Sequence, residues 1–139
     1  MTTQLLLGKE QVLKEVITLA QDWRQKYDQA NFYGGSPEEI REFQKTPAAA
    51  VIQDAQIKLE DYLSKLSFDD VKMLQTVMYL GRDKDYDSKL TPNEIYDDYL
   101  RYIGGNGWNT KEIEIGQMTE KLPLGEYLTN GLKILDITI

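Results

Sequence analysis

"SFDDVKMLQTVMYLG", residues 67–81, is the stretch that decides the fold of this 139-residue chain. Ser67, with Asp70 three residues later, has the pattern of a capped helix start. The apolar residues that follow recur at helical spacing and cover a broad face, made of Val71, Met73, Leu74, Val77, Met78 and Tyr79. A face this broad predicts a central helix with neighbours on several sides. Gly81 suits the left-handed residue that ends such a helix.

Three helices are predicted before this stretch. Through residues 9–30 the apolar positions recur at intervals of three and four, which is the spacing of one helix face. "SPEE", residues 36–39, supplies an N-cap, a proline at the first helical position and a capping-box glutamate. A short helix is therefore expected over residues 37–45. Thr46-Pro47 restarts the chain in the same way, and an amphipathic helix is expected from there to Leu66.

Further helices are predicted after the central stretch. One of them carries an apolar stripe with two tyrosines that we expect to face the core, made of Ile95, Tyr96, Tyr99, Leu100 and Ile103. It is expected to end at "GGNGW", a turn that holds Trp108 before Asn109 or Thr110 caps the next helix. Pro123 interrupts the last apolar pattern, which then continues in register to Leu135.

These patterns predict an all-α fold, with residues 1–139 forming a single domain of about six helices joined by short loops. The chain is long enough to bury a core without disulfides or metal ions. "QLLL" near the start and "DITI" at the end are apolar but short, so neither predicts a substantial sheet.

The composition disfavours several classes of function. With 16 Lys and Arg against 23 Asp and Glu, the formal charge of -7 repels nucleic acids and anionic membranes. No apolar run is long enough to span a bilayer, and the first ten residues lack the features of a signal peptide. We therefore expect a cytoplasmic protein with no nucleic-acid or membrane partner. The absence of Cys and His removes thiolate chemistry, the usual zinc ligands and the commonest proton-transfer group, so we expect no catalytic residues.

Three motifs in the second half of the chain form a larger pattern. "MYLGRDKDYD" ends one helix, "TPNEIYDDYL" begins the next, and "MTEKLPLGEYLTNGLKIL" follows. This pattern resembles the DUF3775 family of small bacterial proteins over about residues 66–135, and residues 9–30 fit the opening helix of that family. The resemblance implies an all-α fold and lends no catalytic residues. The chain departs from the family pattern by Asp83 in place of a glycine and by its inserted "SKLTPNE".

"DKDYDSKLTPNE", residues 83–94, matches the spacing of an EF-hand calcium loop at most ligand positions. Hard oxygen ligands in this order suit Ca²⁺, and outside this hypothesis no cofactor is expected for the leading function. In this hypothesis the ligands are Asp83, Asp85, Asp87, the carbonyl oxygen of Lys89, Thr91 and Glu94. Against it, Ser88 replaces the usual glycine, Gly81-Arg82 is expected to end the preceding helix early, Pro92 fixes its own φ, and no second loop is visible.

The same residues also fit a helix start. Thr91-Pro92-Asn93-Glu94 is a capping box with proline at the first helical position, in which Glu94 turns back to the Thr91 amide. The three aspartates then belong to a solvated turn between two helices. The two interpretations compete for one carboxylate, and we expect the helix start to be the reason for Thr91, Pro92 and Glu94.

Other candidate sites have weaker support. Asp97 and Asp98 are neighbours on a helix and point about 100° apart, so a solvated face is expected rather than a carboxylate pair. The glycines of "IGGNGW" follow no strand and lack the P-loop lysine, so they predict a turn rather than a phosphate site. The aromatic residues that include candidate anchors for a protein partner are Trp23, Phe32, Tyr33 and Trp108. Core packing is expected for most of these four.

Three function hypotheses follow. The leading one is a non-enzymatic protein-interaction module that binds a protein partner or a second copy of itself. The alternative is a calcium-binding module that uses residues 83–94. A weaker alternative is a Mg²⁺-dependent hydrolase built on carboxylates.

Overall fold

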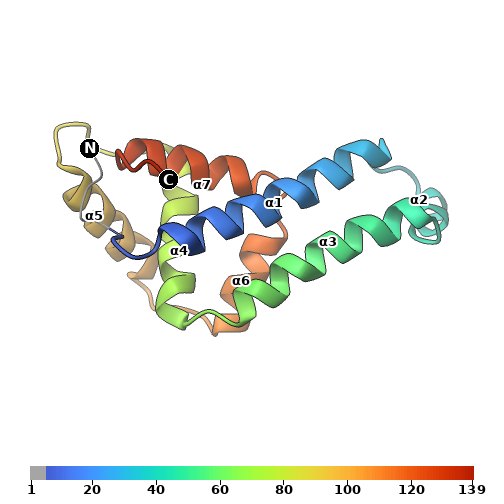
Figure 1. Ribbon diagram of the computed structural model, residues 1–139, viewed down its shortest axis with the longest axis horizontal. Coiled ribbons are helices and arrows are strands. Elements are labelled where there is room, and N and C mark those ends of the chain that lie inside the picture. The colour runs from blue at the N-terminus through green and yellow to red at the C-terminus, as the bar shows by residue number, and fades with distance from the viewer. Residues whose placement is uncertain (1–5) are drawn as a thin grey trace.

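The computed structural model describes residues 6–139, which fold into seven helices and form no strand (Figure 1). The helices are α1 (Glu10–Ala30), α2 (Pro37–Gln44), α3 (Pro47–Ser64), α4 (Phe68–Asp83), α5 (Pro92–Gly104), α6 (Lys111–Thr119) and α7 (Leu124–Ile134). The predicted all-α fold is confirmed. There is one helix more than the expected six or so because the last apolar pattern is divided, and Pro123 becomes the N-cap of α7.

The structure describes the apolar segment at the end of the chain completely and the one near the start only in part. "DITI" forms no strand, and its Ile137 is buried against the core. Gln4 and Leu5 of "QLLL" lie outside the described residues. None of the helices between residues 6 and 139 combines the length and apolarity that a bilayer crossing requires.

Helix starts follow the predicted capping pattern. Five helices begin at a side chain that accepts a backbone hydrogen bond, namely Ser36, Thr46, Ser67, Thr91 and Thr110. At Ser67, one of the two hydrogen bonds of a capping box forms. The Ser67 hydroxyl accepts from the Asp70 N–H at 3.1 Å, but the Asp70 carboxylate pairs with Lys9 Nζ at 2.7 Å. This ion pair ties the start of α4 to the start of α1.

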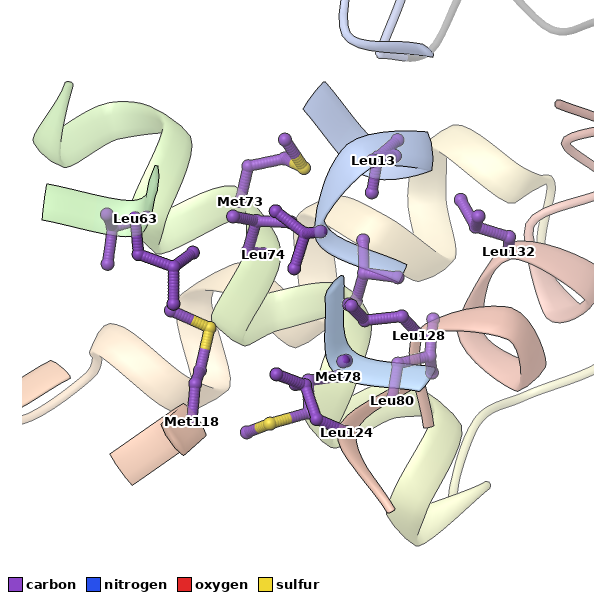
Figure 2. Packing of buried hydrophobic residues seen from close by; sticks show 14 of the residues in the cluster. Leu13, Leu63, Met73, Leu74, Met78, Leu80, Met118, Leu124, Leu128 and Leu132 are labelled. Carbon is purple, nitrogen blue, oxygen red and sulfur yellow. The ribbon is translucent and has the colours of Figure 1, made fainter. Parts of the chain in front are cut away.

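α4 is the central helix, as predicted. It packs against α5, α6 and α7, and nine of its residues are buried. Figure 2 shows Met73, Leu74, Met78 and Leu80 of α4 among leucines and a methionine from α1, α3, α6 and α7. Each such side chain contributes about 1.5–3 kcal/mol when it is fully buried, so this cluster is the main source of stability.

The prediction that Gly81 ends α4 is wrong. α4 continues past it, and the left-handed residue is Lys84, with φ 56°. Gly81 is buried where α4 crosses α7, and a Cβ there would lie 1.8 Å from the Tyr127 carbonyl oxygen. Gly131 of α7 meets α4 in the same way, since its Cβ would lie 2.2 Å from the Val77 carbonyl oxygen. Both glycines are therefore needed because two helix backbones touch there.

α1 and α3 run antiparallel as a pair whose far end projects from the rest of the molecule, with α2 at its tip (Figure 1). The buried residues of the pair all belong to the near end and are Leu13, Val16, Ala20, Trp23, Ala55, Leu59 and Leu63. From Arg24 to Asp54 no residue is buried. Residues 24–54 are named the arm below. The arm has helical structure but no core of its own.

Candidate functional site

The Glu94 carboxylate caps α5. Its Oε1 accepts a hydrogen bond from the Thr91 N–H at 3.0 Å, and the Thr91 hydroxyl accepts one from the Glu94 N–H at 3.3 Å. The backbone hydrogen bond from Thr91 holds the pKa of Glu94 below its usual value. The helix start expected at Thr91 is therefore confirmed, and the side chain that an EF-hand would direct at calcium is directed at the backbone.

Asp83, the first residue of the acidic window, has two partners of its own. Arg82 Nε donates to Asp83 Oδ1 at 2.8 Å, and the Tyr99 hydroxyl donates to Oδ2. Burial alone would raise the pKa of Asp83, but the hydrogen bonds from Arg82 and Tyr99 outweigh it and hold the pKa below its usual value. Since α4 extends to Asp83, the expected early end of the helix at Gly81-Arg82 is also wrong.

The other two aspartates lie in the loop after α4. Asp87 Oδ1 accepts from the Lys89 N–H at 2.9 Å, which closes a local turn. Asp85 and Asp87 line one hollow of about 350 Å³ together with Asp98 and three tyrosines. The predicted ligands outside this lining are Asp83, Lys89, Thr91 and Glu94. No group of three or more carboxylates in the described part of the chain is placed to hold a metal ion. The calcium module stays a prediction that this geometry does not favour.

The remaining sequence candidates have structural roles. Asp97 and Asp98 are exposed, as expected. Trp23 is buried in the core, and Trp108 is half-buried against Gly104, where a Cβ would lie 2.6 Å from the indole Nε1. "GGNGW" is a turn, with a hydrogen bond of 2.9 Å from the Gly107 N–H to the Gly104 carbonyl oxygen. Trp108 thus packs against the end of α5, and the turn leads from α5 to α6.

A large hollow with a mainly apolar lining lies at the tip of the arm. It measures about 570 Å³ and is named the tip groove; its lining is Tyr27, Phe32, Tyr33, Gly34, Ile40, Phe43, Gln44, Ala49, Ile52, Gln53 and Gln56. The lining residues come from the end of α1, the loop after it, α2 and the first half of α3. The groove therefore depends on the packing of these three helices at the tip.

Aromatic contacts hold the tip groove in shape. The rings of Phe32 and Phe43 stack with centroids 4.2 Å apart, and Tyr27 meets Tyr33 edge-on with centroids 6.0 Å apart. Tyr33 is nevertheless 67% exposed, and α2 buries none of its residues although it is amphipathic. Of the predicted aromatic anchors, Phe32 and Tyr33 are thus the two that the structure brings to a surface groove.

A second candidate site was not indicated by the sequence patterns. It is a hollow of about 400 Å³ between α4, α5 and α6, named the polar cleft, and its lining is Tyr79, Arg82, Asp83, Tyr102, Ile103, Asn106, Gly107, Asn109, Glu114 and Gln117. Behind it lies Gln75 of α4, which is fully buried. The available signal was a glutamine inside the apolar run "MLQTVM" and a glutamate next to Ile115 in an apolar stripe.

No family model, curated protein or solved structure matches this chain. The resemblance to the DUF3775 family stays a prediction from the sequence motifs.

Proposed function

We propose that this chain is a cytoplasmic, non-enzymatic protein-interaction module that self-associates through the tip groove. The observation that carries the proposal is the arm, in which no residue from Arg24 to Asp54 is buried. Apolar side chains gathered in a groove on a soluble domain are typical of a binding surface. In this chain they gather at the part of the fold that contributes least to the core.

The shape of the groove suits a helix as its occupant. α2 places Ile40 and Phe43 three residues apart on one face, which is the spacing of anchors in helix-in-groove recognition. Two tyrosines, Tyr27 and Tyr33, line the same groove, and tyrosine is enriched among residues that dominate interface energy. Because Ile40 and Phe43 belong to the lining, two copies would meet with α2 against α2, and the apolar side chains of each copy would complete the groove of the other.

The distribution of charge favours a second copy as the partner. The arm holds four Lys and Arg against five Asp and Glu, a net charge of -1, whereas the whole chain carries -7. Two copies that meet at their arms thus bring together the least repulsive part of the surface. The acidity of the rest of the molecule opposes contacts elsewhere and supports a protein rather than a nucleic acid as the partner.

The test is the mass of the full chain in solution, measured by light scattering across a wide range of protein concentration. We expect a dimer whose dissociation constant rises about tenfold or more in Ile40→Glu, as for the loss of an interface anchor worth over about 1 kcal/mol. Because α2 buries no residue, this substitution should leave the core intact. A circular-dichroism spectrum and melting curve check that point.

Ile113→Glu is the matched control. Ile113 is 50% exposed on α6, outside the arm, so the same change of size and charge there should leave the dimer unchanged. A chain that is monomeric at every concentration contradicts self-association, and so does a dimer that both substitutions weaken equally.

A further inference from the structure

The polar cleft contains a carboxylate that no basic side chain neutralises. Glu114 is 4% exposed, and its Oε2 lies 3.4 Å from Gln75 Nε2, a long hydrogen bond from a neutral amide. None of the ion pairs found within residues 6–139 includes Glu114. Buried carboxylates in proteins are normally paired with a cation or bonded to several donors, because leaving water is costly for a charge. Glu114 therefore lacks a partner that this rule requires.

The side-chain oxygen of Gln75 is a second acceptor in this region, and it lacks a hydrogen-bond donor within residues 6–139. Gln75 Nε2 lies 3.1 Å from the Glu114 carbonyl oxygen and 3.0 Å from Gln117 Oε1, in addition to the Glu114 carboxylate. These three acceptors fix the orientation of the amide, since a flipped Gln75 would place its own oxygen against three others. Gln75 Oε1 is consequently buried, and it has no hydrogen-bond partner among the described residues. Gln75 thus holds a buried oxygen without a donor, in contact with a carboxylate whose hydrogen bond is long.

The basic residue of the cleft is already in use. Arg82 donates from Nε to Asp83, and its guanidinium carbon lies 4.4 Å from the centre of the Tyr79 ring. The charges of Arg82 and Asp83 balance each other in the wall of the cleft. Lys121 Nζ lies beside the cleft, 5.4 Å from the centre of the Tyr79 ring, but Lys121 is outside the lining and pairs with Glu120 at 3.4 Å. Within the lining, the carboxylate of Glu114 is the charge that remains, and it favours a positively charged occupant.

We propose that the polar cleft binds a small organic cation, an aliphatic amine or guanidine, whose N–H groups donate to Glu114. Such groups supply several charge-assisted donors at once, which is what the acceptors around Glu114 lack. The rings of Tyr79 and Tyr102 line the cleft and suit the aliphatic body of the ligand, while Asn106 and Asn109 offer side-chain oxygens for a second polar end. A volume of about 400 Å³ suits a molecule of this size. The proposal is independent of the arm and of self-association.

The experiment is a titration of the ¹⁵N-labelled full chain with putrescine and with agmatine, followed by the shifts of its amide resonances. We expect saturable shifts that centre on Asn109, Glu114 and Gln117. Tetramethylammonium, a cation without N–H donors, should cause none of these shifts. The proposal is overturned if neither probe shifts these resonances in a saturable way, or if tetramethylammonium acts as they do. Shifts centred on the hollow of Asp85, Asp87 and Asp98 would also overturn it.

Two variants sharpen the test. Glu114→Gln should weaken binding of the two probes tenfold or more, whereas Glu112→Gln, which removes the same charge from an exposed position of the same helix, should leave it unchanged. Equal binding by both variants would refute the role of Glu114. If Glu114→Gln disturbs the fold, Asn109→Lys provides a second test. Asn109 is exposed in the lining of the cleft, and the positive charge of the new lysine should repel the probes. Undiminished binding in Asn109→Lys would overturn the site.

Discussion

Three carboxylates of this chain differ in how well they are hydrogen-bonded, because different donors lie close to each of them. Glu94 accepts from a backbone N–H, and Asp83 accepts from an arginine and a tyrosine. Among residues 6–139, Glu114 accepts from the amide of Gln75 alone. The first two are stabilised as anions, which the lowered pKa values of both express. Glu114 is the residue of the three whose environment leaves an acceptor to be satisfied from outside.

Tyr96 gives a prediction on pH dependence. Burial raises its pKa to about 12, whereas a tyrosine in an unfolded chain loses its proton near pH 10. Above about pH 10 the folded state therefore keeps a proton that the unfolded state has lost. The stability that this group contributes is fully present below pH 10 and is lost as pH rises toward 12. The free energy of unfolding should fall by about 1.4 kcal/mol per pH unit for one proton. Urea unfolding at several pH values measures this slope.

Tyr96→Phe tests this prediction, since the substitution should remove the contribution of one proton to the alkaline slope. Burial also raises the pKa values of Tyr62 and Tyr99, so these two tyrosines should contribute to the slope that remains in Tyr96→Phe. An unchanged slope in Tyr96→Phe would contradict the assignment.

At the scale of elements, the contact between α4 and α7 sets how the helices are arranged. Gly81 and Gly131 let the two backbones approach more closely than any side chain allows. The leucines of α7 then reach the apolar side of α4, and Figure 2 shows Leu128 and Leu132 as members of the core cluster. The close crossing is thus a condition for the packing around it.

Gly81→Ala should destabilise the fold by about 3 kcal/mol or more, the upper end of overpacking, because its Cβ would overlap the Tyr127 carbonyl oxygen, a backbone atom that cannot rotate away. Chemical denaturation measures the free energy of unfolding. Gly116→Ala is the matched control, since Gly116 lies inside α6 and a Cβ there meets nothing within 4 Å. It should raise stability by about 0.5–1 kcal/mol through helix propensity. Equal effects of the two substitutions would disprove the close crossing.

At the scale of the whole molecule, stability and exposed apolar surface are separated. The core cluster surrounds α4, whereas the arm buries no residue and carries the tip groove (Figure 1). The part of the chain that can change its contacts is therefore not the part that holds the fold together.

This separation predicts the pattern of amide hydrogen exchange in the native protein. Amides of α4 from Met73 to Leu80 should exchange only on global unfolding and be the slowest, since these residues are almost all buried. Amides of α2 should exchange through local opening, faster by several orders of magnitude when the protein is dilute. Protection of α2 should rise with protein concentration if the arm self-associates. Protection of α2 equal to that of α4 in dilute solution would contradict this account.

Much of the fold could be predicted because local rules govern it. The periodicity of apolar residues gave the helices, and the serine and threonine caps gave their starts, including the one at Thr91 that competes with a calcium loop. These features depend on residues three or four apart in the chain, which physical rules for an isolated helix already cover.

The role of Gly81 and both candidate sites were decided by the tertiary structure. Gly81 has the sequence signature of a helix end, but the close approach of α7 makes it a contact point inside α4. The tip groove combines residues of α1, α2 and α3, and the polar cleft joins Gln75 to Glu114, 39 positions apart. The sequence by itself determines which segments are helical and which faces are apolar. Only packing determines which polar groups are buried together and which apolar faces are left uncovered, because both depend on contacts between residues distant in the chain.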